Sequence, residues 1–229
     1  MQRPPLVLDV DGTLTRPSGP GLDPRTFDAL ASWDAPVIFA TGKSFPYPVG
    51  LCQFVGIPER VVAENGGVVY TGDRTIVTGD RAAAEAVARE YHDAGYDLGW
   101  GCDDTVNRWR ETELAVARDQ PREPLEAIAA EYGLEVVDTG YAYHVKDPAV
   151  SKGAGLDALA GAIGLDLEGC VAIGDSENDV STFERVGRSF AVANADEAAK
   201  RAADEVLEAQ HADGTLTVLE RFGGETGAE

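Results

Sequence analysis

Five short apolar runs restrict the fold of this chain more than any other feature. Each is too short for a buried helix, and most are stopped by glycine or an acidic residue, which is typical of a strand buried in a sheet. The runs occupy residues 6–8, 36–40, 61–63, 170–173 and 189–192. Helical segments alternate with them at residues 24–33, 47–55, 151–163, 177–186 and 196–203. This alternation predicts an α/β fold with a mostly parallel sheet.

The middle of the chain has a different pattern, which indicates a second unit inserted into the first. Its predicted helices are residues 81–94 and 124–132. Extended stretches are expected around Val106, Trp109 and 114–116, and at 134–137 and 141–145. These elements predict a small α+β cap of two helices on an antiparallel sheet. We therefore expect a core of residues 1–79 and 151–229, a second domain of residues 80–150, and a frayed tail at 223–229.

The charge balance argues against one class of partner. The 229 residues include 40 Asp and Glu against 19 Lys and Arg, a formal net charge of −21. Such a surface repels phosphate backbones, so we expect no nucleic acid to bind. Adaptation to high salt, where ions screen the self-repulsion, is favoured over a merely acidic surface. No apolar run approaches the roughly 20 residues of a membrane helix, and the first run is too short for a secretion signal. We expect a cytoplasmic protein with no membrane contact.

Polar clusters follow four of the predicted strands. They are Asp9 with Asp11, Thr41 with Gly42, Glu64 with Asn65, and Asp175 with Asp179. In open parallel sheets, ligands bind in the crevice beyond the carboxyl ends of the strands. The four clusters are therefore expected to converge on one edge of the sheet, although Asp9 and Asp175 are far apart in the sequence.

The chemistry of these residues favours phosphoryl transfer. Asp9 and Asp11 can both point into one crevice, where one carboxylate serves as nucleophile or metal ligand and the other gives and takes protons. Asp175 and Asp179 add carboxylate oxygens that suit Mg²⁺. Lys152, one of four lysines in the chain, begins a helix and can neutralise a phosphate. Each residue alone also fits turn or cap chemistry, but the combination is hard to explain that way.

These motifs resemble those of the haloacid dehalogenase superfamily of phosphohydrolases. The run Asp-Val-Asp-Gly-Thr-Leu-Thr at 9–15 is similar to its first motif, and Thr41-Gly42 resembles the second. Lys152 resembles the third motif, and Gly-Asp-Ser-Glu-Asn-Asp at 174–179 the fourth. The resemblance spans nearly the whole chain and implies a Rossmann-like core, with a C2-type cap between the second and third motifs. Within that branch, the chain is most similar to the archaeal-type phosphoglycolate phosphatases.

The resemblance implies Mg²⁺-dependent hydrolysis of a phosphomonoester through an aspartyl-phosphate, with 2-phosphoglycolate as the expected substrate. Asp9 would be the nucleophile and Asp11 the general acid and base. The implied ligands of Mg²⁺ are Asp9, Asp11 through its backbone carbonyl, Asp175 and Asp179. The implied substrate-binding residues are Lys152, Thr41, Gly42 and Asn178. A small phosphorylated metabolite is therefore the expected partner, and the assembly is expected to be a monomer or homodimer.

Several basic residues are left outside this assignment. Lys43 departs from the pattern, because many cap-bearing relatives have arginine there. Arg108, Arg110 and Arg118 could meet a substrate carboxylate, but exposed strand positions are the favoured interpretation, since arginine is usually exposed. The three histidines are likewise expected to be ordinary surface or core residues rather than catalytic groups.

Other functions fit part of the pattern. A sugar-phosphate phosphatase would need a roomier cap, and a phosphosugar mutase would isomerise its substrate without net release of phosphate. A metal-dependent glycosyltransferase also carries Asp-x-Asp, but its acids normally follow a nucleotide-binding half, and here only eight residues precede Asp9. A non-catalytic binding module would more naturally have lost Asp9 or Asp11. The phosphatase therefore remains the main hypothesis.

Overall fold

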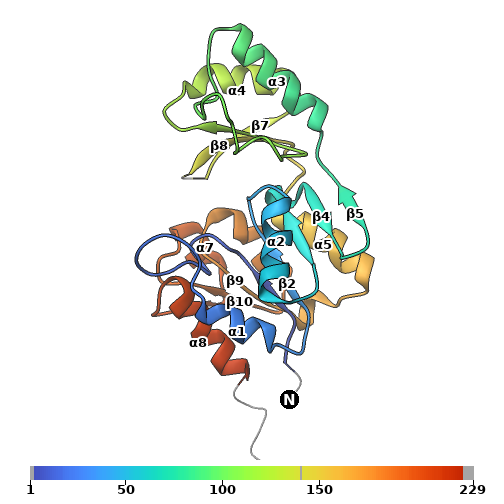
Figure 1. Ribbon diagram of the computed structural model, residues 1–229, viewed down its shortest axis with the longest axis vertical. Helices are drawn as coiled ribbons and strands as arrows, with labels where there is room; N and C mark the ends of the chain where they lie inside the picture. The colour runs from blue at the N-terminus through green and yellow to red at the C-terminus, as the bar shows by residue number, and fades with distance from the viewer. Residues whose placement is uncertain (1–2, 140, 224–229) are drawn as a thin grey trace, which may run out of the picture.

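The computed structural model describes residues 3–139 and 141–223, which form two sheets with their helices (Figure 1). The larger sheet has eight strands in the order β11-β10-β9-β1-β2-β3-β4-β5. They are β1 (Leu6–Leu8), β2 (Val37–Ala40), β3 (Val61–Ala63), β4 (Val68–Tyr70), β5 (Thr75–Val77), β9 (Val171–Gly174), β10 (Arg188–Ala191) and β11 (Glu205–Val206). The six strands from β11 to β3 run parallel, and the hairpin of β4 and β5 extends the sheet with antiparallel pairing.

Strand β1 lies at the centre because its side chains are apolar throughout. It pairs with β2 on one side and β9 on the other, so that Leu6 is opposite both Val37 and Val171. Leu6 and Leu8 are completely buried. A strand that is apolar on both faces needs helices on both sides of its sheet, and this arrangement brings the residue after β1 into the middle of the sheet edge.

Two groups of helices pack on the two faces of the large sheet (Figure 1). One group is α1 (Arg25–Ala31), α2 (Pro46–Val55) and α8 (His211–Gly223), and the other is α5 (Lys152–Ile163), α6 (Val180–Phe183) and α7 (Glu197–Ala202). Three short 3₁₀ segments lie at Glu64–Gly66, Leu167–Gly169 and Glu177–Asp179. Helix α5 is defined by its caps, because the Ser151 hydroxyl accepts from the backbone N–H of Ala154 and Gly164 ends it with φ +69°. Its first residue is therefore Lys152.

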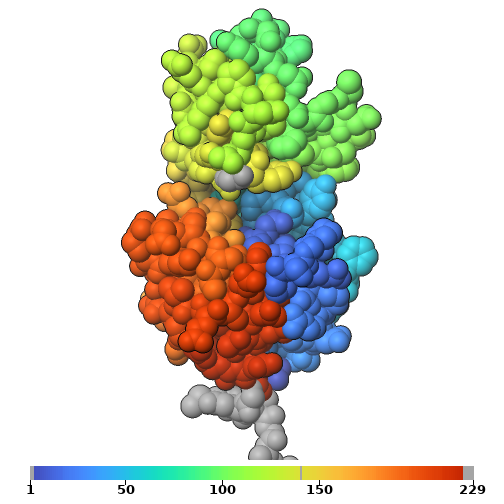
Figure 2. All heavy atoms as spheres, turned by 90° about the vertical axis from the view of Figure 1, so that its left-hand side faces the viewer, coloured from blue at the N-terminus to red at the C-terminus, as the bar shows by residue number. Residues whose placement is uncertain are grey.

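The smaller sheet is antiparallel and belongs to the middle of the chain. Its strands, in the order β6-β8-β7, are β6 (Leu114–Ala117), β8 (Ala142–Lys146) and β7 (Glu135–Asp138). Helices α3 (Arg81–Asp93) and α4 (Arg122–Glu131) cover one face, with Tyr91, Leu125 and Val145 buried between the layers. Figure 2 shows this middle part of the chain stacked on the rest of the molecule along its long axis. We call it the cap and the rest the core.

A buried carboxylate ties the cap to the core. Glu64 follows β3 in a left-handed conformation with φ +51°, and its side chain is fully buried. Its carboxylate accepts hydrogen bonds from the backbone N–H of Glu111, at 2.9 and 3.0 Å, and of Thr112, at 2.8 Å, and from the Thr112 hydroxyl at 2.8 Å. Gly67 lies so close to this turn that a Cβ there would be 2.0 Å from Thr112 Oγ1. The segment before β6 is therefore fixed against the edge of the large sheet.

The predicted mostly parallel α/β fold with an antiparallel α+β cap is confirmed. The prediction of extended structure at Val106 and Trp109 is wrong, because that segment consists of turns and only β6 is a strand. The Asp104 carboxylate accepts from the backbone N–H of Val106 and Asn107, both at 2.9 Å, which favours a turn over a strand. The domain boundaries 1–79, 80–150 and 151–229 stay a prediction.

The end of the chain also differs from expectation. Helix α8 was not predicted, because Gly214 and Thr215 are poor helix formers; the helix is held by Val218 and Leu219, which are buried against the core. Gly223, predicted to begin a frayed tail, ends α8, and the rest of the predicted tail lies outside the described residues. Within the described ranges, no helix is long and apolar enough to cross a membrane.

Candidate active site

The four polar clusters predicted at strand ends do lie along one edge of the large sheet. Their strands, β9, β1, β2 and β3, are consecutive neighbours in that sheet. Asp175 follows β9, Asp9 follows β1, Thr41 follows β2, and Asn65 lies two residues after β3. All four line one cavity of about 500 Å³. The strand order therefore brings residues from distant parts of the sequence to a common site, as the alternating pattern predicts.

Lys152 is the centre of the buried charges at this edge. Its Nζ donates to Asp9 Oδ1 and to Asp179 Oδ1, both at 2.7 Å, and its side chain is completely buried. Burial opposes the charged form, but the two carboxylates outweigh it and raise the pKa of Lys152 above its usual value. A buried lysine of this kind stays charged, so it is a permanent cation beside Asp9.

Asp179 organises the loop after β9. Its Oδ2 accepts from the backbone N–H of Asp175 at 2.9 Å and of Ser176 at 3.1 Å. Gly174 must be glycine here, because a Cβ would lie 2.4 Å from Asp179 Oδ2. With one oxygen on the loop and the other on Lys152, Asp179 holds Asp175 and Lys152 in a fixed relation to each other.

Three carboxylates lie close enough together to hold a metal ion. Asp9, Asp175 and Asp179 each offer an oxygen, and these oxygens lie within 4.8 Å of one another. Burial, offset by Lys152 and reinforced by Asp179, raises the pKa of Asp9 from 3.8 to about 7. Burial and the nearby charges of Asp9 and Asp179 raise the pKa of Asp175 from 3.8 to about 8. An all-carboxylate donor set fits Mg²⁺ and not zinc, which prefers histidine and cysteine.

The predicted residues Asp11, Thr41 and Gly42 each have a different neighbour in the structure. The Asp11 carboxylate is half-exposed, and its Oδ2 lies 3.1 Å from Nζ of Lys43, a residue that the sequence assignment left out. The Thr41 hydroxyl accepts from the backbone N–H of Lys43 at 3.1 Å. Gly42 borders the cavity beside Asn65, where a Cβ would come within 3.0 Å of the Asn65 Oδ1. Asp11, Thr41 and Gly42 all line the same cavity as Asp9.

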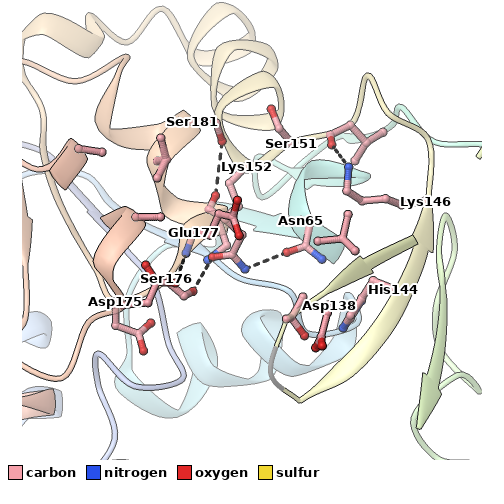
Figure 3. Close-up of a pocket in the computed structure, with 18 of the residues that line it drawn as sticks. Asn65, Asp138, His144, Lys146, Ser151, Lys152, Asp175, Ser176, Glu177 and Ser181 are labelled. Atoms are coloured by element: carbon pink, nitrogen blue, oxygen red, sulfur yellow. Dashed lines mark hydrogen bonds between the residues drawn. The ribbon is translucent and has the colours of Figure 1, made fainter. Parts of the chain in front are cut away.

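Asn178 is part of a network rather than an isolated donor. Its Nδ2 donates to Asn65 Oδ1 at 3.1 Å, and its Oδ1 accepts from the Ser176 hydroxyl at 2.8 Å (Figure 3). Thr13, which follows Gly12 in the first motif, is fully buried and is not among the described residues that line this cavity. Its hydroxyl has no hydrogen-bond partner among the described residues.

A second cavity, of about 910 Å³, adjoins the first between the cap and the core. The two share the lining residues Asn65, Thr139, His144, Asp175, Ser176 and Asn178. Figure 3 shows His144 and Asp138 coming from the cap strands on one side and Asp175 and Ser176 from the core loop on the other. A bound molecule would therefore touch both parts of the chain.

Comparison with known proteins agrees with this geometry. Residues 119–219 match the family of haloacid dehalogenase-like hydrolases. A phosphoglycolate phosphatase of Natronomonas pharaonis is 59% identical over 219 residues, which cover 95% of this chain and 96% of that protein. The chain belongs to the haloacid dehalogenase-like hydrolase family. A phosphoglycolate phosphatase of Halobacterium salinarum is 56% identical, over 96% of this hydrolase and 97% of that protein.

The fold of this hydrolase also matches a solved structure. The crystal structure of Thermoplasma acidophilum 0175 superposes with a TM-score of 0.80 at 22% identity, and the match covers 97% of this chain and 99% of that chain. The superfamily resemblance read from the motifs is thus confirmed. The two phosphoglycolate phosphatases come from halophilic archaea, in agreement with the predicted adaptation to high salt.

The hydrolase carries one buried charged group beside the site that sequence reasoning missed. The favoured interpretation of Arg110 as an exposed strand residue is wrong, because it directly follows a turn and its side chain is only 6% exposed. Arg110 pairs with Glu113, and Glu113 Oε1 lies 3.0 Å from Nδ1 of His144. Burial opposes ionisation of Glu113, but His144 and Arg110 outweigh it and lower its pKa to about 2. Arg108 is exposed, as expected.

Two signals in the sequence could have found this group. The run from 110 to 113 combines one basic and two acidic residues within four positions, a spacing that suits an ion pair only if the backbone turns. The turn itself is indicated by Asp104 two residues before Val106. What the sequence does not indicate is that Glu64 anchors this turn, because that contact joins two separate parts of the chain.

Proposed function

We propose that this hydrolase is a Mg²⁺-dependent phosphomonoesterase that acts through an aspartyl-phosphate and hydrolyses 2-phosphoglycolate to glycolate and phosphate. The observation that carries the proposal is the cluster of Asp175 with the buried Asp9, Lys152 and Asp179 at one sheet edge. Support for the substrate comes from relatives of that name at 56% and 59% identity over nearly the whole chain.

The first step would be attack on phosphorus by the Asp9 carboxylate. An oxygen–phosphorus bond forms to Asp9 while the bond from phosphorus to the glycolate oxygen breaks. Asp11 donates its proton to that oxygen, so the leaving group departs as an alcohol. In the second step, Asp11 takes a proton from water as the water attacks phosphorus, and Asp9 is released as a carboxylate with inorganic phosphate.

The other residues would stabilise charge on the phosphoryl group. Lys152 is held as a cation by its two carboxylate partners and is suited to offset charge on the phosphoryl oxygens. Thr41 and the amide of Gly42 would donate to the same oxygens, and Asn178 would keep the loop after β9 in place through Asn65. Mg²⁺, held by Asp9, the Asp11 carbonyl, Asp175 and Asp179, would supply the remaining positive charge when bound.

The proposal also covers the roles of the two domains, the substrate class, the location of the protein and its assembly state. The core of residues 1–79 and 151–229 would carry the chemistry, and the cap of residues 80–150 would close over the substrate and exclude water. The protein would act on a small phosphorylated metabolite in the cytoplasm, as a monomer or homodimer.

The test is release of inorganic phosphate from a panel of esters, measured with Mg²⁺ and with EDTA, at low and at molar salt. The panel holds 2-phosphoglycolate, two sugar phosphates and p-nitrophenyl phosphate. We expect Mg²⁺-dependent release led by 2-phosphoglycolate, and none in Asp9→Asn. Asp28→Asn, an exposed aspartate on α1, is the matched control and should behave like the wild type. Release led by a sugar phosphate would refute the substrate, and no release at any salt would refute the activity.

A further inference from the structure

On the cap side of the smaller cavity, charged and polar side chains form a corner that none of the proposed hydrolysis steps uses. We call the residues Arg110, Glu113 and His144 the cap triad. Arg110 Nη1 donates to Glu113 and to the carbonyl oxygen of Gly42 at 3.1 Å. His144 Nδ1 lies 3.0 Å from Glu113 Oε1, and Glu113 Oε2 accepts from Asn65 Nδ2 at 3.0 Å. The triad is therefore fixed both to the cap strand β8 and to the edge of the core.

Arg110 and His144 each have one side-chain nitrogen that makes no hydrogen bond within the described residues. Arg110 uses Nε on the Val106 carbonyl and Nη1 as above, while Nη2 has no hydrogen-bond partner among residues 3–139 and 141–223. Over the same ranges, His144 Nε2 also lacks a partner. Neither atom is among the fully buried polar atoms without a hydrogen-bond partner. Both nitrogens are therefore accessible to solvent. Both residues line the cavity that Asp9, Asp11 and Thr41 also line.

The charge of the corner favours an anion. Glu113 is a carboxylate, and its three donors, on Asn65, Arg110 and His144, occupy both of its oxygens. The Arg110 guanidinium balances the charge of Glu113, and His144 as an imidazolium gives the triad a net positive charge. A purely structural triad would need no open nitrogen, because Glu113 is already satisfied. A planar guanidinium with a free edge beside an imidazole nitrogen is the arrangement that binds a carboxylate with two hydrogen bonds.

The position of the cap triad relative to Asp9 limits the length of a ligand that contacts both. Arg110 donates to the carbonyl oxygen of Gly42, whose neighbour Thr41 lines the same cavity as Asp9. A carboxylate on the triad and a phosphoryl group at Asp9 are therefore held by neighbouring parts of one cavity, which suits a short linker. The cap triad fits a small phosphorylated carboxylic acid better than a neutral ester.

We propose that Arg110 Nη2 and the Nε2–H of His144, as an imidazolium whose Nδ1–H donates to Glu113, bind the carboxylate of the substrate and thereby select phosphorylated acids over neutral phosphate esters. This inference rests on the proposed function, because it places the phosphoryl group of the same substrate at Asp9. Glu113 is a positioning residue, which orients both donors without touching the substrate.

The test compares two phosphate esters that differ only at the end that would contact the cap triad. Ethyl phosphate has a methyl group where 2-phosphoglycolate has its carboxylate, so the ratio of their kcat/KM values measures recognition of the carboxylate. Arg110→Lys keeps a cation beside Glu113 but loses the second guanidinium nitrogen. His144→Asn keeps a donor for Glu113 and removes the nitrogen that faces the cavity. Arg108→Lys changes an exposed arginine in the same turn and serves as the matched control.

We expect the wild type and Arg108→Lys to prefer 2-phosphoglycolate strongly. In Arg110→Lys and in His144→Asn that preference should fall about 10- to 100-fold, the loss typical of one charged hydrogen bond, mainly through a higher KM. Circular dichroism and thermal melting establish that each variant is folded before its ratio is measured. Two substitutions on different elements keep the test decisive if one of them does not fold.

Three results would overturn the inference. If the variants lose activity on both esters by the same factor, the triad has only a structural role. If the wild type hydrolyses ethyl phosphate as well as 2-phosphoglycolate, no carboxylate is recognised, although the proposed phosphatase activity stands. If the wild type releases phosphate from neither ester, the proposed function itself fails and the inference with it.

Discussion

Removing a carboxylate from the candidate site should stabilise the protein when no divalent cation is present. The perturbation is Asp175→Asn, which keeps the size of the side chain and removes its charge. Burial and repulsion from Asp9 and Asp179 raise the pKa of Asp175 from 3.8 to about 8. A carboxyl group whose pKa is raised in the folded state costs stability above its unfolded pKa, and the cost grows with pH until the folded pKa is reached.

The magnitude follows from the pKa. The rise spans about four pKa units, and each unit corresponds to about 1.36 kcal/mol, which sets an upper limit of about 5 kcal/mol at pH 8. Because Asp175 borders a cavity open to water, solvent screens part of the repulsion. We expect about 2 kcal/mol of stabilisation, or a melting temperature about 4–8 °C higher for a chain of this size.

The assay is thermal unfolding of wild type and Asp175→Asn in EDTA at pH 8 and pH 5, and again with Mg²⁺. The difference in EDTA should shrink about threefold at pH 5, because that pH is close to the unfolded pKa. Mg²⁺ should stabilise the wild type and have little effect on the variant, and Asp28→Asn should respond like the wild type. A variant that melts below the wild type in EDTA, or a difference equal at both pH values, would refute the reasoning.

Three further outcomes are expected. Lys152→Met leaves two buried carboxylates without their cation and should lower the free energy of unfolding by about 3 kcal/mol in urea at pH 8; a loss under about 1 kcal/mol would contradict this. Asp11→Asn should change stability by no more than about 0.5 kcal/mol, because its ion pair is exposed, yet reduce phosphate release at least about 100-fold; a matching loss of stability would argue against a catalytic role. Glu113 has a pKa lowered from 4.5 to about 2, so its ionised form should add about 3 kcal/mol of stability at neutral pH, lost as pH falls from about 4.5 to 2. Denaturation of wild type and Glu113→Gln at pH 7 and pH 3 measures this, and a gap independent of pH would count against it.

The core side of the site could be predicted because its signals are local. Asp9 and Asp175 each follow an apolar strand, and parallel strands end at a common edge whatever lies between them in sequence. Lys152 could be predicted because a serine cap defines the start of its helix. The contact of Lys152 with Asp9 and Asp179 could not be seen in advance, but it follows once the strand order is known.

Helix α8 could not be predicted from local preference. Its first turns contain Gly214 and Thr215, and the helix forms because Val218 and Leu219 are buried against the core. Tertiary packing overrides weak propensity in such a segment. The hydrogen bond from Asn178 to Asn65 could not be predicted either, because the two residues are more than a hundred positions apart and meet only in the folded chain.

The cap side of the site was misread for a more instructive reason. Arginine is usually exposed, so Arg110 was assigned to a surface strand. Its burial depends on the turn between residues 110 and 113, and that turn is held by Glu64, a core residue with a left-handed backbone. A local pattern cannot contain this information, because the two segments meet only after the sheet has formed. Candidate site residues at strand ends can thus be predicted from the sequence, whereas the cap residues proposed to bind the carboxylate can be recognised only in the structure.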